Sequence, residues 1–201
     1  MSLFTAKSLL ESARIVALAN SRQGYVRASR SILLEASNQA AEDESFDIFL
    51  SHSSLDTDLV LGLKTQIETM GYSIYVDFVT DNQMERSEAS KETAKLLKQR
   101  MENSRCLFFA TSSNSSISKW MPWECGFFDG KKPNKVAICP ISMIGTAYSY
   151  HGQEYLALYP YVSKESPQGQ SDEVLWINET SSKYERFDNW LLGHQPYERQ
   201  R

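Results

Sequence analysis

Short apolar runs alternate with helical patterns from residue 46 onward, and this alternation limits the possible folds more than any other feature of the sequence. The runs hold four to six residues rich in Ile, Val, Phe and Tyr, which suits strands buried on both faces of a sheet. They lie at 46–50, 73–76, 106–110, 136–141 and 174–177. Apolar residues recur at helical spacing between them. We therefore expect parallel β–α–β units in an α/β fold, with five parallel strands covered by helices on both faces.

The chain before residue 45 carries a different pattern. Residues 3–20 and 24–40 have apolar side chains at helical spacing, which predicts two helices. The polar stretch at 42–45 marks a boundary, so we expect a helical extension at 1–44, a main domain at 45–193 and a polar tail at 194–201. The extension is expected either to pack on the main domain or to build an oligomer interface.

The connection at 142–171 is long, has no clear period and contains five tyrosines. It is either an irregular covering layer packed by its own aromatic rings or a functional flap that holds a short helix. After it, Phe187, Trp190 and Leu191 fall on one side of a last helix, expected at about 183–192.

Composition excludes several classes of protein. A net charge of −4 and a pI near 5.5 argue against nucleic-acid binding by bulk charge. Three separated cysteines (Cys106, Cys125, Cys139) form neither a disulfide framework nor a zinc ligand set, so we expect reduced core residues. No apolar run approaches the ~20 residues of a membrane helix, and the pattern of a secretory signal is missing. These features predict a cytoplasmic protein with no membrane or nucleic-acid partner.

Polar segments follow the first three predicted strands, at 51–56, 77–86 and 111–124. Ligands of an open parallel sheet bind beyond the carboxyl ends of its strands, so these segments are candidate site loops. The first segment could hold a phosphate on free backbone N–H groups, or simply cap the next helix through Ser54 or Asp56. His52 within it is either a general base or a structural histidine. The second segment is either a loop that closes over a ligand or a solvated connector.

Glu124 follows the third strand at the start of a helix. Pro122 is tolerated only near a helix start, so the helix is expected to begin just before it. Trp120 and Glu124 are then four residues apart on one face, and the positive helix end favours the carboxylate. The residue types leave two interpretations open: a carboxylate desolvated by nearby indoles for chemistry, or a plain partner of the helix dipole.

Three motifs in order resemble Toll/interleukin receptor (TIR) domains. Residues 46–54 (FDIFLSHSS) with Asp56 look like the opening motif, 71–77 (GYSIYVD) like the second strand and the start of the mobile loop, and 118–124 (SKW, three residues, Glu) like the catalytic segment. The resemblance covers about residues 45–192. The chain is similar to stand-alone bacterial members of the family, such as those of Thoeris-type antiphage defence. It implies a flavodoxin-like five-stranded parallel sheet, with residues 1–44 outside it as a helical extension.

The resemblance also implies an activity: cleavage of NAD+ at the nicotinamide–ribose bond, releasing ADP-ribose or a cyclic ADP-ribose isomer used as an immune signal. Glu124 would be the catalytic residue, because a carboxylate stabilises the oxocarbenium-like ribose. The residues expected to bind substrate are Phe49, Ser51, His52, Ser53, Asp77, Phe78, Arg86, Ser112 and Trp120. NAD+ is expected as substrate, with no cofactor and no metal. The expected partners are further copies of the chain, joined through the TIR domain and the N-terminal helices, and an effector that senses the product.

Two other functions stay open at this point. One is a non-catalytic assembly module, which would be indifferent to replacement of Glu124. The other is a nucleoside-transferring enzyme on a similar sheet, in which a glutamate is a covalent nucleophile. A substrate panel separates that enzyme from one that consumes NAD+.

Overall fold

The computed structural model describes residues 1–21, 27–41, 44–77, 91–145, 147–152 and 154–198. Its core is one mixed sheet. The parallel strands, in spatial order, are β3 (Ile74–Val76), β2 (Phe46–Ser51), β4 (Ser104–Thr111), β5 (Val136–Ser142) and β6 (Tyr161–Glu165). The antiparallel strands β7 (Val174–Asn178), β8 (Lys183–Arg186) and β9 (Tyr197–Glu198) continue the sheet, and β1 (Phe4–Thr5) pairs in parallel with β5.

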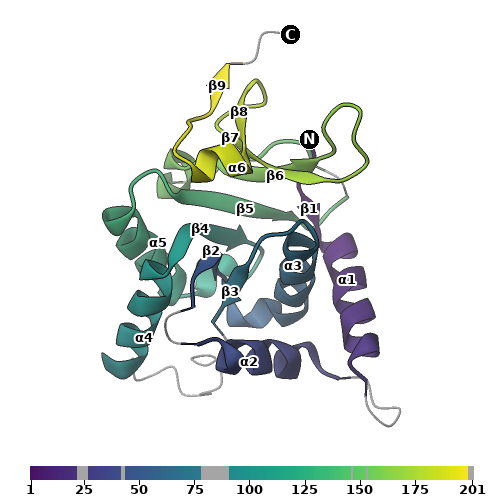
Figure 1. The fold of residues 1–201 in the computed structure, drawn as a ribbon, viewed down its shortest axis with the longest axis vertical. Helices are drawn as coiled ribbons and strands as arrows, with labels where there is room; N and C mark the ends of the chain where they lie inside the picture. Colours follow the sequence, from purple (N-terminus) through teal and green to yellow (C-terminus); the bar gives the residue numbers. More distant parts are fainter. Residues whose placement is uncertain (22–26, 42–43, 78–90, 146, 153, 199–201) are drawn as a thin grey trace.

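Helices cover both faces of this sheet (Figure 1). The α-helices are α1 (Ala6–Ala19), α2 (Ser29–Gln39), α3 (Thr57–Thr69), α4 (Lys91–Glu102), α5 (Trp120–Lys131) and α6 (Phe187–Leu191). Short 3-10 turns are η1 (Ser54–Asp56), η3 (Ser115–Ile117) and η4 (Glu154–Leu158). Helices α4 and α5 lie on one side of the sheet and α1 and α3 on the other. The predicted α/β class with a parallel core is therefore confirmed.

The fifth parallel strand is not where the sequence pattern put it. It is β6, inside the tyrosine-rich connection, whereas the run at 174–177 forms β7 and pairs antiparallel with β6. A parallel crossover needs a dozen or more residues, and the link at 166–173 is too short for one. The link turns back instead, with Gly169 at a φ of +82°. The helix expected at about 183–192 is also shorter: its first four residues form β8, and only Phe187–Leu191 are helical.

Alternating strand side chains divide the core into two layers. In β2, Ile48 and Leu50 join the layer under α1 and α3, whereas Phe49 joins the layer under α4 and α5. All three side chains are at most 1% exposed, as expected for strands buried on both faces. This alternation decides which side chains at the strand ends reach which helix.

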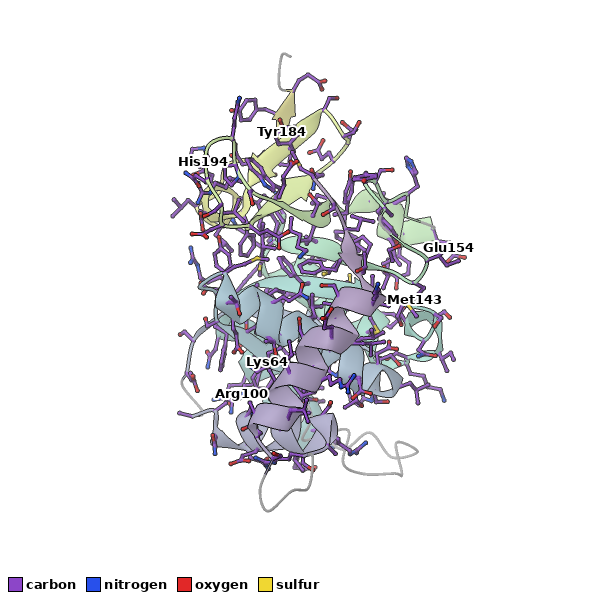
Figure 2. The ribbon with its side chains drawn as sticks, turned by 90° about the vertical axis from the view of Figure 1, so that its right-hand side faces the viewer. Lys64, Arg100, Met143, Glu154, Tyr184 and His194 are labelled. Carbon is purple, nitrogen blue, oxygen red and sulfur yellow. The ribbon has the colours of Figure 1, made fainter. Side chains whose placement is uncertain are left out.

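The N-terminal residues share this core. Leu9 of α1 and Leu33 of α2 are both buried in the layer that contains α3. Helix α1 crosses the front of the molecule in Figure 2 and packs along α3, where the Gln66 side-chain amide donates to the hydroxyls of Ser8 and Ser12. The 1–44, 45–193 and 194–201 division stays a prediction, but α1 and α2 pack directly against the domain that they precede.

Helix α2 is held across the β3 edge of the sheet by Arg100 of α4. The Arg100 guanidinium donates to the carbonyls of Ala40 and Ala41 and lies 5.1 Å from the ring centroid of Tyr75. Ser37 of α2 and the Tyr75 hydroxyl are 3.4 Å apart. A buried cation that binds two backbone carbonyls and an aromatic face fixes α2 more firmly than apolar contact alone.

Candidate active site

Strands β2, β3 and β4 are neighbouring and parallel, so their carboxyl ends lie together along one border of the sheet, which we call the carboxyl edge. Tyr75 and Phe49 belong to the core layer under α4 and α5, so Ser51 and Asp77, each two residues further on, continue toward the same face. Leu50 pairs with Val76, which makes Ser51 and Asp77 cross-strand neighbours. The sequence motifs therefore do converge in space, at the edge where ligands of parallel sheets bind.

Glu124 reaches this edge from α5. The helix begins at Trp120, in agreement with the position expected from Pro122, and buries Met121, Glu124, Cys125 and Phe128. These positions follow helical spacing, so the carboxylate lies on the apolar face that packs on the sheet. Glu124 is 6% exposed, and the Ser51 hydroxyl donates to its Oε2 at 2.5 Å. A hydrogen bond this short to a carboxylate is charge-assisted and fixes the orientation of that oxygen.

Asp77 is a second buried carboxylate beside this pair. The residue is 8% exposed, and its Oδ1 has no hydrogen-bond partner among the residues that the structure describes. Its charge reaches the neighbouring Tyr75, since burial first and the Asp77 carboxylate second raise the pKa of that phenol to about 12. Phe78 and Arg86, also expected at the site, lie outside the described residues.

His52 and Phe49 take different places. His52 is 9% exposed, and its Nδ1 donates to the Leu50 carbonyl at 3.1 Å, which holds the imidazole against the turn after β2. Phe49 is fully buried, with its ring centroid 5.7 Å from that of Tyr75. Its side chain therefore lies in the core layer beneath the site, and its expected role in binding substrate stays a prediction.

Asp56 ties two rim loops together. It occupies the N-cap position of α3, as considered for it, but its side chain makes no cap bond there. Its Oδ1 accepts from Asn114 Nδ2 at 2.7 Å, and its Oδ2 accepts from the Ser112 hydroxyl. The loop after β2 is thus bonded to the loop after β4. Ser53 caps the intervening turn by accepting from the Leu55 N–H at 3.4 Å.

Removal of this link is expected to loosen both loops. The change Asp56→Ala leaves two donors without their acceptor, and we expect the free energy of unfolding to fall by about 1–3 kcal/mol. Asp56→Asn, which keeps one acceptor oxygen, should lose less. Chemical denaturation of the three proteins measures the effect. Equal midpoints for all three would contradict the structural role given to Asp56.

An aromatic wall stands beside Glu124. Trp120 is half-buried, and its ring lies edge-on to Trp123 at a centroid distance of 5.3 Å. Trp123 in turn stacks on Phe127 at 5.8 Å, and the Lys98 ammonium lies 5.9 Å from the Trp123 ring. Trp120 is thus held by ring contacts at the first turn of α5, one helical turn from the carboxylate.

The tyrosine-rich connection supplies residues that sequence reasoning did not assign. Tyr150 hydrogen-bonds Thr111 at the end of β4, and burial raises the pKa of its phenol. Tyr159 donates to Asp129 of α5 at 3.2 Å and hydrogen-bonds Cys125, next to Glu124. Burial raises the pKa of the Cys125 thiol to about 11, so this cysteine is a protonated packing residue. The connection therefore covers α5 and the end of β4. In the sequence, the one signal of this covering role was the presence of five tyrosines in the connection.

Two cavities lie elsewhere. One of about 300 Å³ is bounded by α2, α3 and β3, and one of about 580 Å³ lies along α4. Neither is lined by Glu124, whose carboxylate is covered. Across the described ranges, no group of three or more His, Cys, Asp or Glu side chains could hold a metal ion. No helix among the described residues has both the length and the hydropathy needed to span a bilayer.

Comparison with known proteins finds two relatives. The chain is 46% identical over 191 residues to a Bacillus cereus (strain MSX-D12) protein described as a probable 3' cyclic ADP-D-ribose synthase, ThsB'. That match covers 95% of this chain and 98% of the relative. It is also 29% identical over 92 residues to a candidate cyclic ADP-D-ribose synthase, TIR2, of Cytobacillus dafuensis, which covers 45% of this chain and 24% of that protein. No family model matches the chain.

Proposed function

Since the chain belongs to the family of TIR-domain cyclic ADP-D-ribose synthases represented by the Bacillus cereus relative, we propose that it converts NAD+ into nicotinamide and 3' cyclic ADP-ribose. The observation that carries this proposal is the buried Glu124 carboxylate, oriented by the Ser51 hydroxyl at the carboxyl edge of a parallel sheet. A fixed carboxylate in that position suits the stabilisation of a positive charge.

Glu124 stabilises the positive ribose in this reaction. Cleavage of the C–N bond releases nicotinamide as a neutral ring, so no acid is needed to protonate the leaving group. Positive charge develops instead on the anomeric carbon of the ribose, and a fixed carboxylate lowers the energy of that state. Burial strengthens the effect, because little water is present to screen the charge. Ser51 holds the carboxylate in place through its hydrogen bond.

The remaining residues bind and enclose the substrate. Ser53 and Ser112 belong to the two rim loops joined by Asp56. Their role in this proposal is to bind the ribose and phosphate groups of NAD+. Trp120 forms an aromatic wall beside the nicotinamide ring of the substrate. The covering layer that includes Tyr150 and Tyr159 lowers the access of water, which ring closure requires because water competes with the attacking hydroxyl.

The cyclic product is the basis of a signalling role. We propose that it is an immune signal in antiphage defence and is sensed by a separate effector. Copies of the chain associate through the TIR domain and the N-terminal helices. Support for the second contact comes from the outer face of α1, where Leu10, Ile15 and Leu18 are 47%, 62% and 48% exposed. These exposed apolar side chains share the outer face of α1 with Glu11 and Arg14, a mixed composition that suits a contact between copies of the chain.

Incubation of the purified protein with NAD+ tests the proposal. Chromatography with mass spectrometry is expected to show free nicotinamide and a product lighter than ADP-ribose by one water, which elutes with a 3' cyclic ADP-ribose standard. ADP-ribose alone would make the protein a hydrolase. No nicotinamide at any protein concentration, with an unchanged nucleoside panel, would favour the assembly module. Turnover of nucleosides instead of NAD+ would favour the transferase.

A further inference from the structure

Ring closure needs a proton acceptor that the proposed function has not yet supplied. A hydroxyl of the adenosine ribose must lose its proton as its oxygen bonds to the anomeric carbon of the other ribose. An unassisted alcohol is a weak nucleophile, and a positioned base that takes the proton accelerates such steps by about 10²–10⁴-fold. The polar side chains near Glu124 differ in the hydrogen bonds that they already make.

Two nearby carboxylates already accept hydrogen bonds, and a nearby histidine is held by a bond that it donates. The Glu124 carboxylate accepts from Ser51 and faces the developing positive charge. Both carboxylate oxygens of Asp56 are bonded across the rim, to Asn114 and Ser112. His52 is tied to the Leu50 carbonyl through Nδ1, which fixes its ring against the backbone.

Asp77 differs from these groups. It is 92% buried, and its Oδ1 meets no donor within the described part of the chain. Burial of a carboxylate oxygen without a partner costs free energy, so such an atom is expected to receive a donor from a ligand. Leu50 pairs with Val76, which places Asp77 one strand away from Ser51, about 4.8 Å across the sheet. Ser51 bonds Glu124, so Ser51 neighbours both acidic residues at the strand ends: Glu124 through a hydrogen bond and Asp77 through the strand register.

From this placement we propose that Asp77 is the general base of the cyclisation step, an inference that rests on the proposed function. The bond between the anomeric carbon and the nicotinamide nitrogen breaks, and its electron pair leaves with nicotinamide. The ribose hydroxyl oxygen forms the new bond to that carbon, and its proton passes to Asp77 and then to solvent. The balance is NAD+ to nicotinamide, cyclic ADP-ribose and one proton. Glu124 and Asp77 thus divide the work: one stabilises the cation and the other activates the nucleophile.

The division predicts a change in product rather than a simple loss of activity. Asp77→Asn keeps the shape of the side chain but removes the base, so cyclic product formation should fall by about 10²-fold. Water is small and abundant and can shed its proton to solvent, so nicotinamide release continues and ADP-ribose accumulates. Asp77→Glu retains a carboxylate one methylene further out and should keep more of the cyclic product than Asp77→Asn does. Products are quantified at several NAD+ concentrations to separate kcat from KM.

The outcomes are distinct. A fall in the ratio of cyclic product to ADP-ribose for Asp77→Asn, with a smaller fall for Asp77→Glu, supports the proposal. An unchanged ratio in both variants, whether through a raised KM or an equal loss of both products, would overturn it and leave Asp77 as a binding or structural residue. If Asp77→Asn does not fold, as judged by its thermal unfolding, Asp77→Ser replaces it as the variant without a base, and the same comparison with Asp77→Glu decides. Wild-type protein without nicotinamide release would instead show that the proposed function itself is wrong.

Discussion

Glu124→Gln is expected to lower nicotinamide release from NAD+ by about 10³-fold or more. The amide has the shape of the carboxylate and can still accept from Ser51, so the fold should be little changed. What is lost is the negative charge that stabilises the ribose cation in a site 6% exposed to solvent. The measurement is the initial rate of nicotinamide release at saturating NAD+, with the thermal midpoint recorded for each protein.

Glu102→Gln provides the matched control. Glu102 is at the end of α4 just before β4, hence at the opposite edge of the sheet, where it pairs with Lys131 on the surface. The same chemical change there should leave the rate within about twofold of wild type, since surface pairs of this kind contribute little. Rates for Glu124→Gln close to those of wild type would show that the charge is not used and that Glu124 is not the catalytic residue.

Much of the core and the central contact of the site were accessible from the sequence. The runs that became β2, β3, β4 and β5 are apolar on both faces, and parallel strands place their carboxyl ends at one edge. That rule alone put the opening motif near Glu124, and the structure has Ser51 bonded to it. The helix start at Trp120 followed from a local constraint, the missing N–H of Pro122.

Other features depend on contacts that no local pattern carries. Three of the five residues of β6 are polar, since Ser163, Lys164 and Glu165 follow two apolar residues, so it lacks the apolar run that marked the other parallel strands. Asp56 has the spacing of a helix cap, but its partners lie 56 and 58 residues away along the chain. Only the assembled sheet brings the two loops together. Phe49 is within the family motif, yet strand alternation turns it into the core.

Gly62→Ala is expected to destabilise the protein although alanine is the better helix former. Gly62 lies in α3 where α1 crosses, and a Cβ there would lie 2.0 Å from the Leu9 carbonyl oxygen and 2.5 Å from its carbonyl carbon. Both are backbone atoms, so relief requires movement of α1 itself. That movement would disturb the packing of Leu9 and Ala13 against α3 and the pairing of β1 with β5. Overpacking of this kind costs about 1–3 kcal/mol or more.

Gly126→Ala is the control, because it measures the effect of helix propensity without a steric clash. Gly126 is also helical, in α5, but it is exposed and a Cβ there meets nothing within 4 Å. Alanine should therefore raise the free energy of unfolding by up to about 1 kcal/mol through helix propensity alone. Chemical denaturation should move the two midpoints in opposite directions. A stabilised Gly62→Ala would mean that α1 does not press on α3, and would make residues 1–44 a detachable extension. If Gly62→Ala is destabilised and also turns over NAD+ more slowly than wild type, α1 is part of the domain that holds Glu124.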